Sequence, residues 1–179
     1  MNNKGQITYV NLFPVIIIIL LIVGGGYLLT KDDLQLPWKN NGSVRVRKVQ
    51  NFPTNLPTTN ENFQKQRLVI KSEAQLQELL NSINEQAYQQ LTETINFDKE
   101  YVIAVTSDTK FSGGTELKIR KIYDEKEDNK YLVSIRERVP GDTCITTQEL
   151  NVAIDLVTIR KTDREIEFER VKEIYKCNE

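Results

Sequence analysis

The chain has 179 residues, of which 27% are charged, and its formal net charge at pH 7 is -1. This length fits one globular domain with a short appendage, because domains commonly contain about 100 to 150 residues. With so little net charge the protein has no overall field to attract nucleic acid, and we expect no nucleic-acid partner. The absence of histidine excludes catalysis by Ser-His or Cys-His pairs and metal sites built on histidine.

The N-terminal region contains a long apolar segment. Residues 12–30 carry no charged side chain and include an uninterrupted run of large aliphatic residues from Val15 to Ile22. A helix from Leu12 to Leu29 rises roughly 27 Å, close to the bilayer hydrocarbon thickness of about 30 Å. We therefore expect a transmembrane anchor over residues 12–30 that contacts membrane lipid, preceded by a cytoplasmic tail over residues 1–11.

Three other interpretations of the apolar segment stay open. It could be a buried core helix, although it has no polar face to meet water. It could be a cleaved signal peptide, because Gly24 to Gly26 supply small residues after the apolar run. Lys4-Gly5 resembles the processing site of a type IV pilin, but Val10 stands where pilins carry a glutamate. The flanking lysines do not settle the orientation of the segment.

The rest of the chain has the composition of a linker followed by a folded domain. Segment 31–42 is polar and contains proline and asparagine, which is typical of a tether. We expect one β-rich domain over residues 43–179, held outside the cytoplasm. At its start, Val44 and Val46 alternate with arginines, which predicts a strand with one wet face. Residues 67–71 predict a second short strand.

One segment of the domain has clear helical periodicity. Its apolar positions are Leu76, Leu79, Leu80 and Ile83. This spacing places the four side chains on one face of a helix that begins at Glu73, with Ser72 as the N-cap. The pattern weakens after that, and residues 87–91 predict a short restart.

The segments that follow the helix have strand patterns. Tyr101 to Val105 is a continuous apolar run, which predicts a central strand covered on both faces. Leu117 and Ile119 alternate, but Ile122 falls out of phase with them, which predicts a β-bulge in a long strand.

The charged segment 124–129 predicts a turn that joins two strands into a hairpin. It lacks the spaced ligands and central glycine of an EF-hand calcium loop, which favours a solvated turn. Val152–Ile159 and Arg164–Arg170 predict a final strand pair, with Ile166 and Phe168 facing inward. The predicted fold class is α+β: after the transmembrane helix, a mainly antiparallel sheet of about six strands with one packed helix.

The sequence contains two cysteines, Cys144 and Cys177, and neither belongs to a CxxC motif. In an oxidising compartment a disulfide between them would fasten the C-terminal tail to the sheet, stabilising the fold by at most about 4 kcal/mol. The other interpretation is two unpaired thiols in a cytoplasmic domain. We favour the disulfide because an anchor precedes the domain and no metal-ligand spacing competes.

Ser107 and Lys110 have the SxxK spacing of serine acyl-transfer enzymes, in which a lysine one helical turn away activates the serine. These two residues follow an apolar strand and precede Gly113-Gly114, which predicts a loop in place of the helix that this mechanism needs. We therefore expect no catalytic centre at this position, and we expect no cofactor.

Residues 97–170 resemble the C-terminal domain of the PrcB family of protease-complex proteins. The resemblance is carried by the order of short motifs along the chain. These are the apolar strand Tyr101–Val105, Ser112-Gly113-Gly114, the alternating Leu117 and Ile119, Val139-Pro140-Gly141, and Gln148 ahead of a Val/Ile strand. Glycines and Pro-Gly pairs are also ordinary turn residues, so the motifs have a purely structural interpretation as well.

The resemblance implies an exported protein that accompanies or stabilises a surface protease and has no catalytic role of its own. It implies Ser112, Gly113, Gly114, Pro140 and Gly141 as a candidate binding or turn motif. From residues and resemblance together we expect a single-pass protein of the bacterial cell membrane that acts as a binding or accessory module. The alternative is a structural, pilin-like component of a surface appendage.

Overall fold

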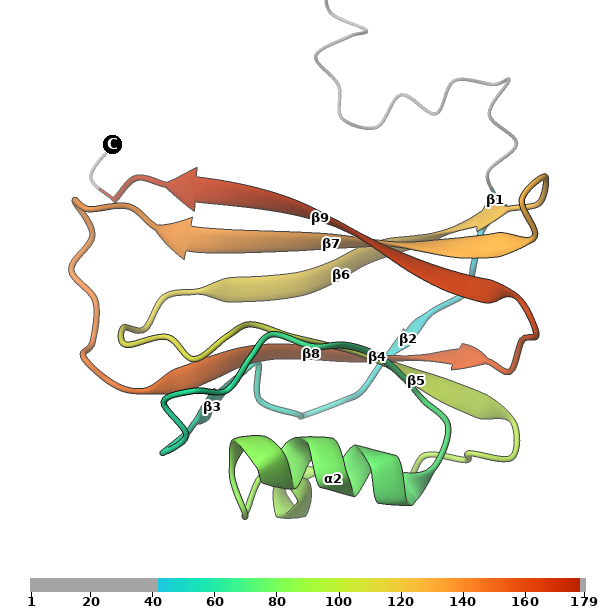
Figure 1. Cartoon of the computed structure of the whole chain (residues 1–179), viewed down its shortest axis with the longest axis horizontal. Helices are drawn as coiled ribbons and strands as arrows, with labels where there is room; N and C mark the ends of the chain where they lie inside the picture. Colours follow the sequence, from blue (N-terminus) through green and yellow to red (C-terminus); the bar gives the residue numbers. More distant parts are fainter. Residues whose placement is uncertain (1–41, 178–179) are drawn as a thin grey trace, which may run out of the picture. The chain divides into compact units, whose positions relative to one another are not determined.

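The computed structural model in Figure 1 describes residues 42–177. The predicted cytoplasmic tail, the anchor over residues 12–30 and the linker up to residue 41 lie outside the described residues. Within residues 42–177, no helix is long and apolar enough to cross a membrane.

The described residues form strands, one α-helix and one 3-10 helix. In chain order these are β1 (Gly42–Ser43), β2 (Arg47–Lys48), β3 (Asn55–Pro57), β4 (Arg67–Ile70), α2 (Glu73–Ile83), η1 (Tyr88–Gln90), β5 (Glu100–Thr106), β6 (Glu116–Glu125), β7 (Lys130–Pro140), β8 (Asn151–Arg160) and β9 (Glu165–Tyr175). The α+β class with one helix agrees with the sequence prediction.

The strands form two sheets, and not the single sheet that the sequence predicts. The first sheet has the order β1-β6-β7-β9, and the second has the order β2-β8-β5-β4, with β3 also pairing with β8. All pairs are antiparallel except β7 and β9, which are parallel. Figure 1 shows the first sheet stacked on the second, with α2 below the second sheet.

The second sheet is covered on both faces, so the domain has two apolar cores. Along β5, Val102 and Ala104 face α2, whereas Ile103 and Val105 face the first sheet. The prediction of a central strand at Tyr101–Val105 is confirmed, because β4 and β8 flank it and both of its faces are covered. Strand β8 is also covered on both faces, because all residues from Asn151 to Ile159 are buried.

The helix α2 forms as the sequence predicts. The Ser72 hydroxyl accepts a hydrogen bond from the Gln75 backbone N–H at 3.3 Å, which satisfies one donor that the first turn leaves unpaired. Its four predicted apolar residues are all buried against the second sheet. The predicted restart is η1, which follows the fully buried Ala87.

The β6–β7 hairpin also agrees with the prediction. Its register shifts between Ile119 and Lys121, which is the predicted bulge. This shift returns Ile122 to the inner face, where it is fully buried. Asn129, at the end of the charged turn, has φ of 52°, a left-handed conformation that asparagine tolerates better than most residues.

One predicted pairing and one predicted strand are wrong. β8 and β9 are consecutive but lie in different sheets, and β9 pairs with β7. Ile166 and Phe168 do face the core between the sheets, as predicted. In place of the predicted strand at Val44–Arg47, two short strands, β1 and β2, flank a link over residues 44–46, where the chain passes from pairing with β6 in the first sheet to pairing with β8 in the second. The alternation of apolar and polar residues along a strand indicates which side chains face inward, but it does not identify the strand that pairs with it.

A buried carboxylate links the two sheets. Asp155, on β8, is 4% exposed, and its Oδ2 accepts a hydrogen bond from the Ile119 backbone N–H of β6 at 2.8 Å. Its Oδ1 has no hydrogen bond but lies 3.3 Å from the Lys48 ammonium, with which it forms an ion pair. The partners come from both sheets, so this side chain joins them at the bulge.

We predict that Asp155→Ala destabilises the fold by about 1 to 3 kcal/mol, because the Ile119 N–H loses its partner. Urea unfolding of the full-length chain, followed by far-UV circular dichroism, measures the change. Asp163→Ala, in the exposed turn between β8 and β9, is the matched control and should leave stability within about 0.5 kcal/mol. Equal stability of the two variants would contradict the role of Asp155.

Candidate functional site

The residues singled out by the sequence gather at one end of the domain. They lie in the β5–β6 loop (residues 107–115), at the end of β7 and in the loop that follows it (residues 140–150), and at the C-terminal end of β9 and just beyond it (residues 175–177), on the left in Figure 1. We call this area the loop-end surface. It contains all seven predicted site residues: Ser112, Gly113, Gly114, Pro140, Gly141, Cys144 and Cys177.

Hydrogen bonds fasten the two loops to each other. The Gly113 N–H donates to the Thr147 carbonyl at 2.9 Å. The Asn151 side chain is 3% exposed, and its amide donates to the carbonyls of Ser112 at 3.2 Å and Glu149 at 3.1 Å. An alanine Cβ at Gly113 would lie 2.4 Å from the Thr147 hydroxyl oxygen, so a side chain here would force the exposed Thr147 side chain to move.

Gly114 joins the β5–β6 loop to the end of β9. Its φ is +91°, a region that side chains disfavour, and its carbonyl accepts a hydrogen bond from the Tyr175 hydroxyl at 2.9 Å. The Arg138 guanidinium lies over the Tyr175 ring, 4.9 Å from its centroid. Tyr175 thus fixes the position of this loop on the first sheet.

Pro140 and Gly141 have different roles. Pro140 is the last residue of β7 and pairs with Tyr175, whereas Gly141 begins the turn that leaves the sheet. The Gly141 N–H donates to the Tyr175 carbonyl at 2.8 Å, and its carbonyl accepts from the Cys144 N–H at 3.0 Å. The tight turn that the sequence predicts here therefore spans residues 141–144.

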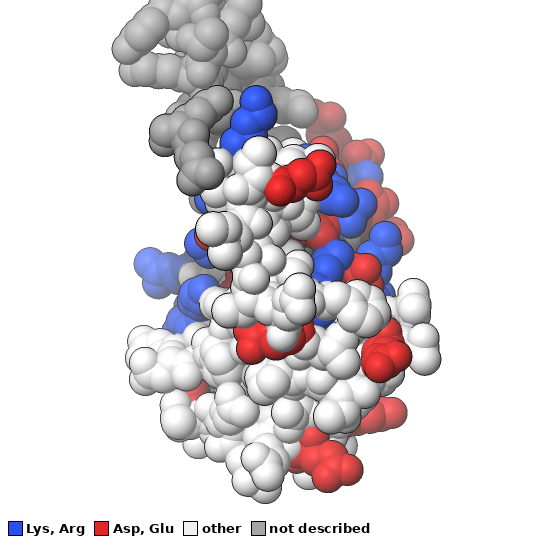
Figure 2. Space-filling view, turned by 90° about the vertical axis from the view of Figure 1, so that its left-hand side faces the viewer, with Lys and Arg blue, Asp and Glu red and all other residues white. Residues whose placement is uncertain are grey.

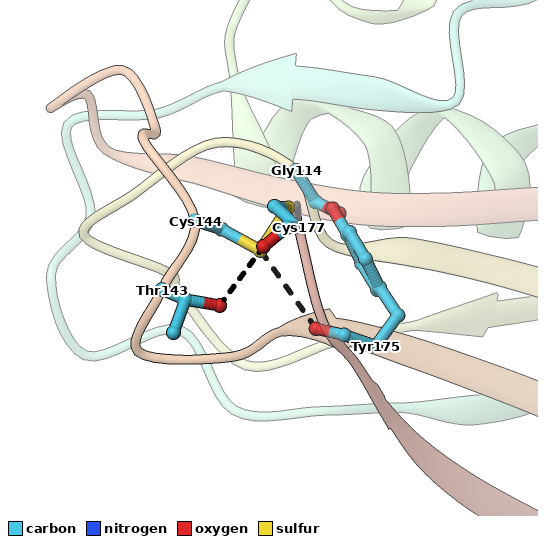
Figure 3. Close-up of a disulfide and its surroundings, with 5 residues drawn as sticks. All are labelled: Gly114, Thr143, Cys144, Tyr175 and Cys177. Atoms are coloured by element: carbon cyan, nitrogen blue, oxygen red, sulfur yellow. Dashed lines mark hydrogen bonds between the residues drawn. A yellow bond between two sulfur atoms is a disulfide. The ribbon is translucent and has the colours of Figure 1, made fainter. Parts of the chain in front are cut away.

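The two cysteines form the disulfide that the sequence favours. The Cα atoms of Cys144 and Cys177 are 4.9 Å apart, and the bond ties the β7–β8 loop to the segment after β9 (Figure 3). The Thr143 hydroxyl donates to the Cys177 carbonyl at 3.2 Å beside it. The bond and the Tyr175 contacts together hold the loop against the sheet.

The loop-end surface presents apolar side chains to water. Phe111 is 67% exposed and Ile145 is fully exposed, and each lies two residues from an end of the Gly113–Thr147 hydrogen bond. Segments 111–115 and 143–148 contain no charged residue. Figure 2, which looks onto this end, shows a broad uncharged area interrupted by a few acidic side chains.

The side chains of Ser107 and Lys110, which have the SxxK spacing, bond to groups other than each other. The Ser107 hydroxyl donates to the Asp108 carbonyl at 2.7 Å and accepts from the Ala153 N–H at 3.0 Å. The Lys110 ammonium lies 2.8 Å from the Asp108 carboxylate and 3.8 Å from that of Glu137. Burial raises the pKa of the Asp108 carboxyl. The hydrogen bond from Lys110, its positive charge and smaller contributions have the opposite effect and are larger in sum, so the pKa is lowered overall.

Comparison with protein families, characterised proteins and solved structures finds no match to this chain. The resemblance to the PrcB family therefore stays a prediction based on its motifs. Within residues 42–177, no three acidic or cysteine side chains come close enough to hold a metal ion.

Sequence reasoning missed three residues of the loop-end surface. Phe111 and Ile145 are large apolar residues inside otherwise polar loop segments, and this is the signal that could have identified them. Tyr175 gives no such signal, because an aromatic residue at the end of a strand is equally typical of a core position.

We predict that Gly114→Ala destabilises the domain by about 1 to 3 kcal/mol, because alanine is strained at positive φ and its Cβ would lie 3.0 Å from the Tyr175 hydroxyl. Thermal unfolding of the full-length chain measures the effect. Gly42→Ala is the control, since its Cβ would make only an ordinary contact at 3.9 Å. Equal melting temperatures for the two variants would show that Gly114 is replaceable.

We predict that replacing both Cys144 and Cys177 by serine lowers the free energy of unfolding by up to about 4 kcal/mol, because the bond closes a loop across 33 residues. Denaturant unfolding measures the change. A reductant should lower the stability of the natural chain by a similar amount and leave the variant unchanged. A variant as stable as the oxidised natural chain would rule out a stabilising role for the bond.

Proposed function

We propose that the protein is a membrane-anchored, extracytoplasmic binding module that acts as a non-catalytic accessory protein. Residues 12–30 are its anchor, and the loop-end surface contacts its partner. Following the PrcB resemblance, the proposed partner is a surface protease.

The observation that carries this proposal is the exposure of Phe111 and Ile145 on loops that are held in place. Exposed apolar side chains that gather on one surface are a mark of protein interaction sites, and aromatic anchors dominate many protein interfaces. The loops are fixed by the disulfide and by the contacts of Gly113 and Gly114. A fixed surface loses little conformational entropy when it binds, which favours affinity.

The disulfide supports a location outside the cytoplasm. Disulfides persist in oxidising compartments and are rare in the cytosol, where thiols are kept reduced. An uncharged segment long enough to span a bilayer precedes the domain in the sequence. External protease added to intact cells or spheroplasts should therefore cleave the domain. Full protection that ends only on lysis would contradict this orientation.

We predict that the double variant Phe111→Lys/Ile145→Lys loses its partner. The full-length protein purified from its native membrane should carry a protease in fixed stoichiometry, and the two charges should reduce the recovered protease at least tenfold. Val46→Lys is the matched control, because Val46 is 37% exposed but lies between β1 and β2, away from this surface. Mass spectrometry and gel quantification measure the recovery.

The same purification distinguishes an accessory module from the alternative, a structural component of a surface appendage. A structural component of an appendage would carry only further copies of this chain, whereas an accessory module carries a different protein. Recovery of copies alone, or equal protease recovery from the Phe111→Lys/Ile145→Lys variant and the natural chain, would overturn the proposal.

A further inference from the structure

The two sheets differ in how their outer strands are protected. β9, at the edge of the first sheet, has six charged residues among its eleven, a common defence against pairing with other chains. β4, at the edge of the second sheet, has the sequence RLVI with one charge and no proline. Its edge is therefore chemically suited to accept another strand.

The hydrogen-bonding groups of β4 alternate between its two sides. The Thr106 N–H donates to the Gln66 carbonyl at 3.0 Å, and in an antiparallel pair every second residue bonds across. Leu68 and Ile70 therefore bond to β5, and the N–H and C=O groups of Arg67 and Val69 point away from the sheet. The next outward N–H, that of Lys71, is capped by the Gln75 side chain at 2.8 Å.

A groove runs between the outer edge of β4, which no other strand within residues 42–177 covers, and the helix α2. Its volume is about 350 Å³, and its lining residues include Leu68, Ile70 and Leu79. Leu68 is 36% exposed and shares the helix-facing side of the sheet with Ile70. Alternate side chains of an added strand would enter this groove, because side chains of a strand alternate between its faces.

The negative charge of Glu78 favours a ligand with a basic side chain. Among residues 42–177, Glu78 is the only charged residue that lines the groove, and it forms no ion pair with any of them. A lysine or arginine two positions from an apolar residue would lie on the same side of an added strand and could reach this carboxylate.

We propose that β4 and α2 bind an extended segment of a partner protein as an additional strand, with an apolar side chain in the groove and a basic one beside Glu78. The outward groups of Arg67 and Val69 provide the main-chain hydrogen bonds, and Leu68 and Leu79 provide the apolar contact. This site is separate from the loop-end surface and does not depend on the function proposed for it.

Fluorescence anisotropy with the full-length protein in lipid nanodiscs tests this site, with empty nanodiscs as the blank. The probe is a labelled seven-residue peptide with blocked ends and the sequence Thr-Val-Thr-Lys-Thr-Val-Thr, in which the lysine lies two positions from each valine and so on the same side of the strand. Two further peptides carry N-methyl groups on alternate backbone nitrogens in the two opposite phases. Saturable binding is expected, and one methylated form should bind at least tenfold more weakly while the other binds normally, because an added strand uses every second N–H.

Protein variants locate the binding site. Leu68→Lys and Glu78→Lys should each weaken binding at least tenfold, whereas Val171→Lys, at a 50% exposed position on the charged strand β9, should leave it unchanged. Glu78 is on the exposed face of α2, so its variant tests the site even if Leu68→Lys fails to fold. Absent binding at millimolar peptide, equal effects of both methylation phases, or unchanged binding by Glu78→Lys would each overturn the proposal.

Discussion

The whole domain depends on burying β5 and β8 on both faces. One face packs against the first sheet and the other against α2, so the second sheet is the centre of a three-layer structure. Charges inside such layers are tolerated only with partners, because an unpaired buried carboxylate is costly. Asp155 has the Ile119 N–H and Lys48, and Glu137 has Arg170 at 2.8 Å.

This central sheet leaves the binding surfaces at the periphery. The loop-end surface is built where β5, β7 and β9 end, and it is held by hydrogen bonds and by the disulfide. The β4–α2 groove lies along an edge of the second sheet. Each surface combines exposed apolar side chains with backbone that the scaffold holds in place, which lowers the entropy lost on binding.

Turn chemistry explains why the motif residues of the sequence meet in space. Gly114 and Gly141 lie far apart in the chain, yet both bond to Tyr175, at its hydroxyl and at its carbonyl. The parallel pairing of β7 and β9 places Tyr175 beside Pro140, and from there it reaches both loops. Residues at a strand end can thus organise a surface whose loops come from several strands.

The sequence by itself determined the local elements. Helix α2, the strand β5 and the bulge at Ile119 follow from periodicity and from a cap within a few residues. Only the tertiary structure decided that β9 pairs with β7 and not with β8, that the strands divide into two sheets, and that the loops carrying Phe111 and Ile145 are bonded to each other. The physical reason is that alternation specifies the face of a residue, whereas strand partners are selected by long-range packing.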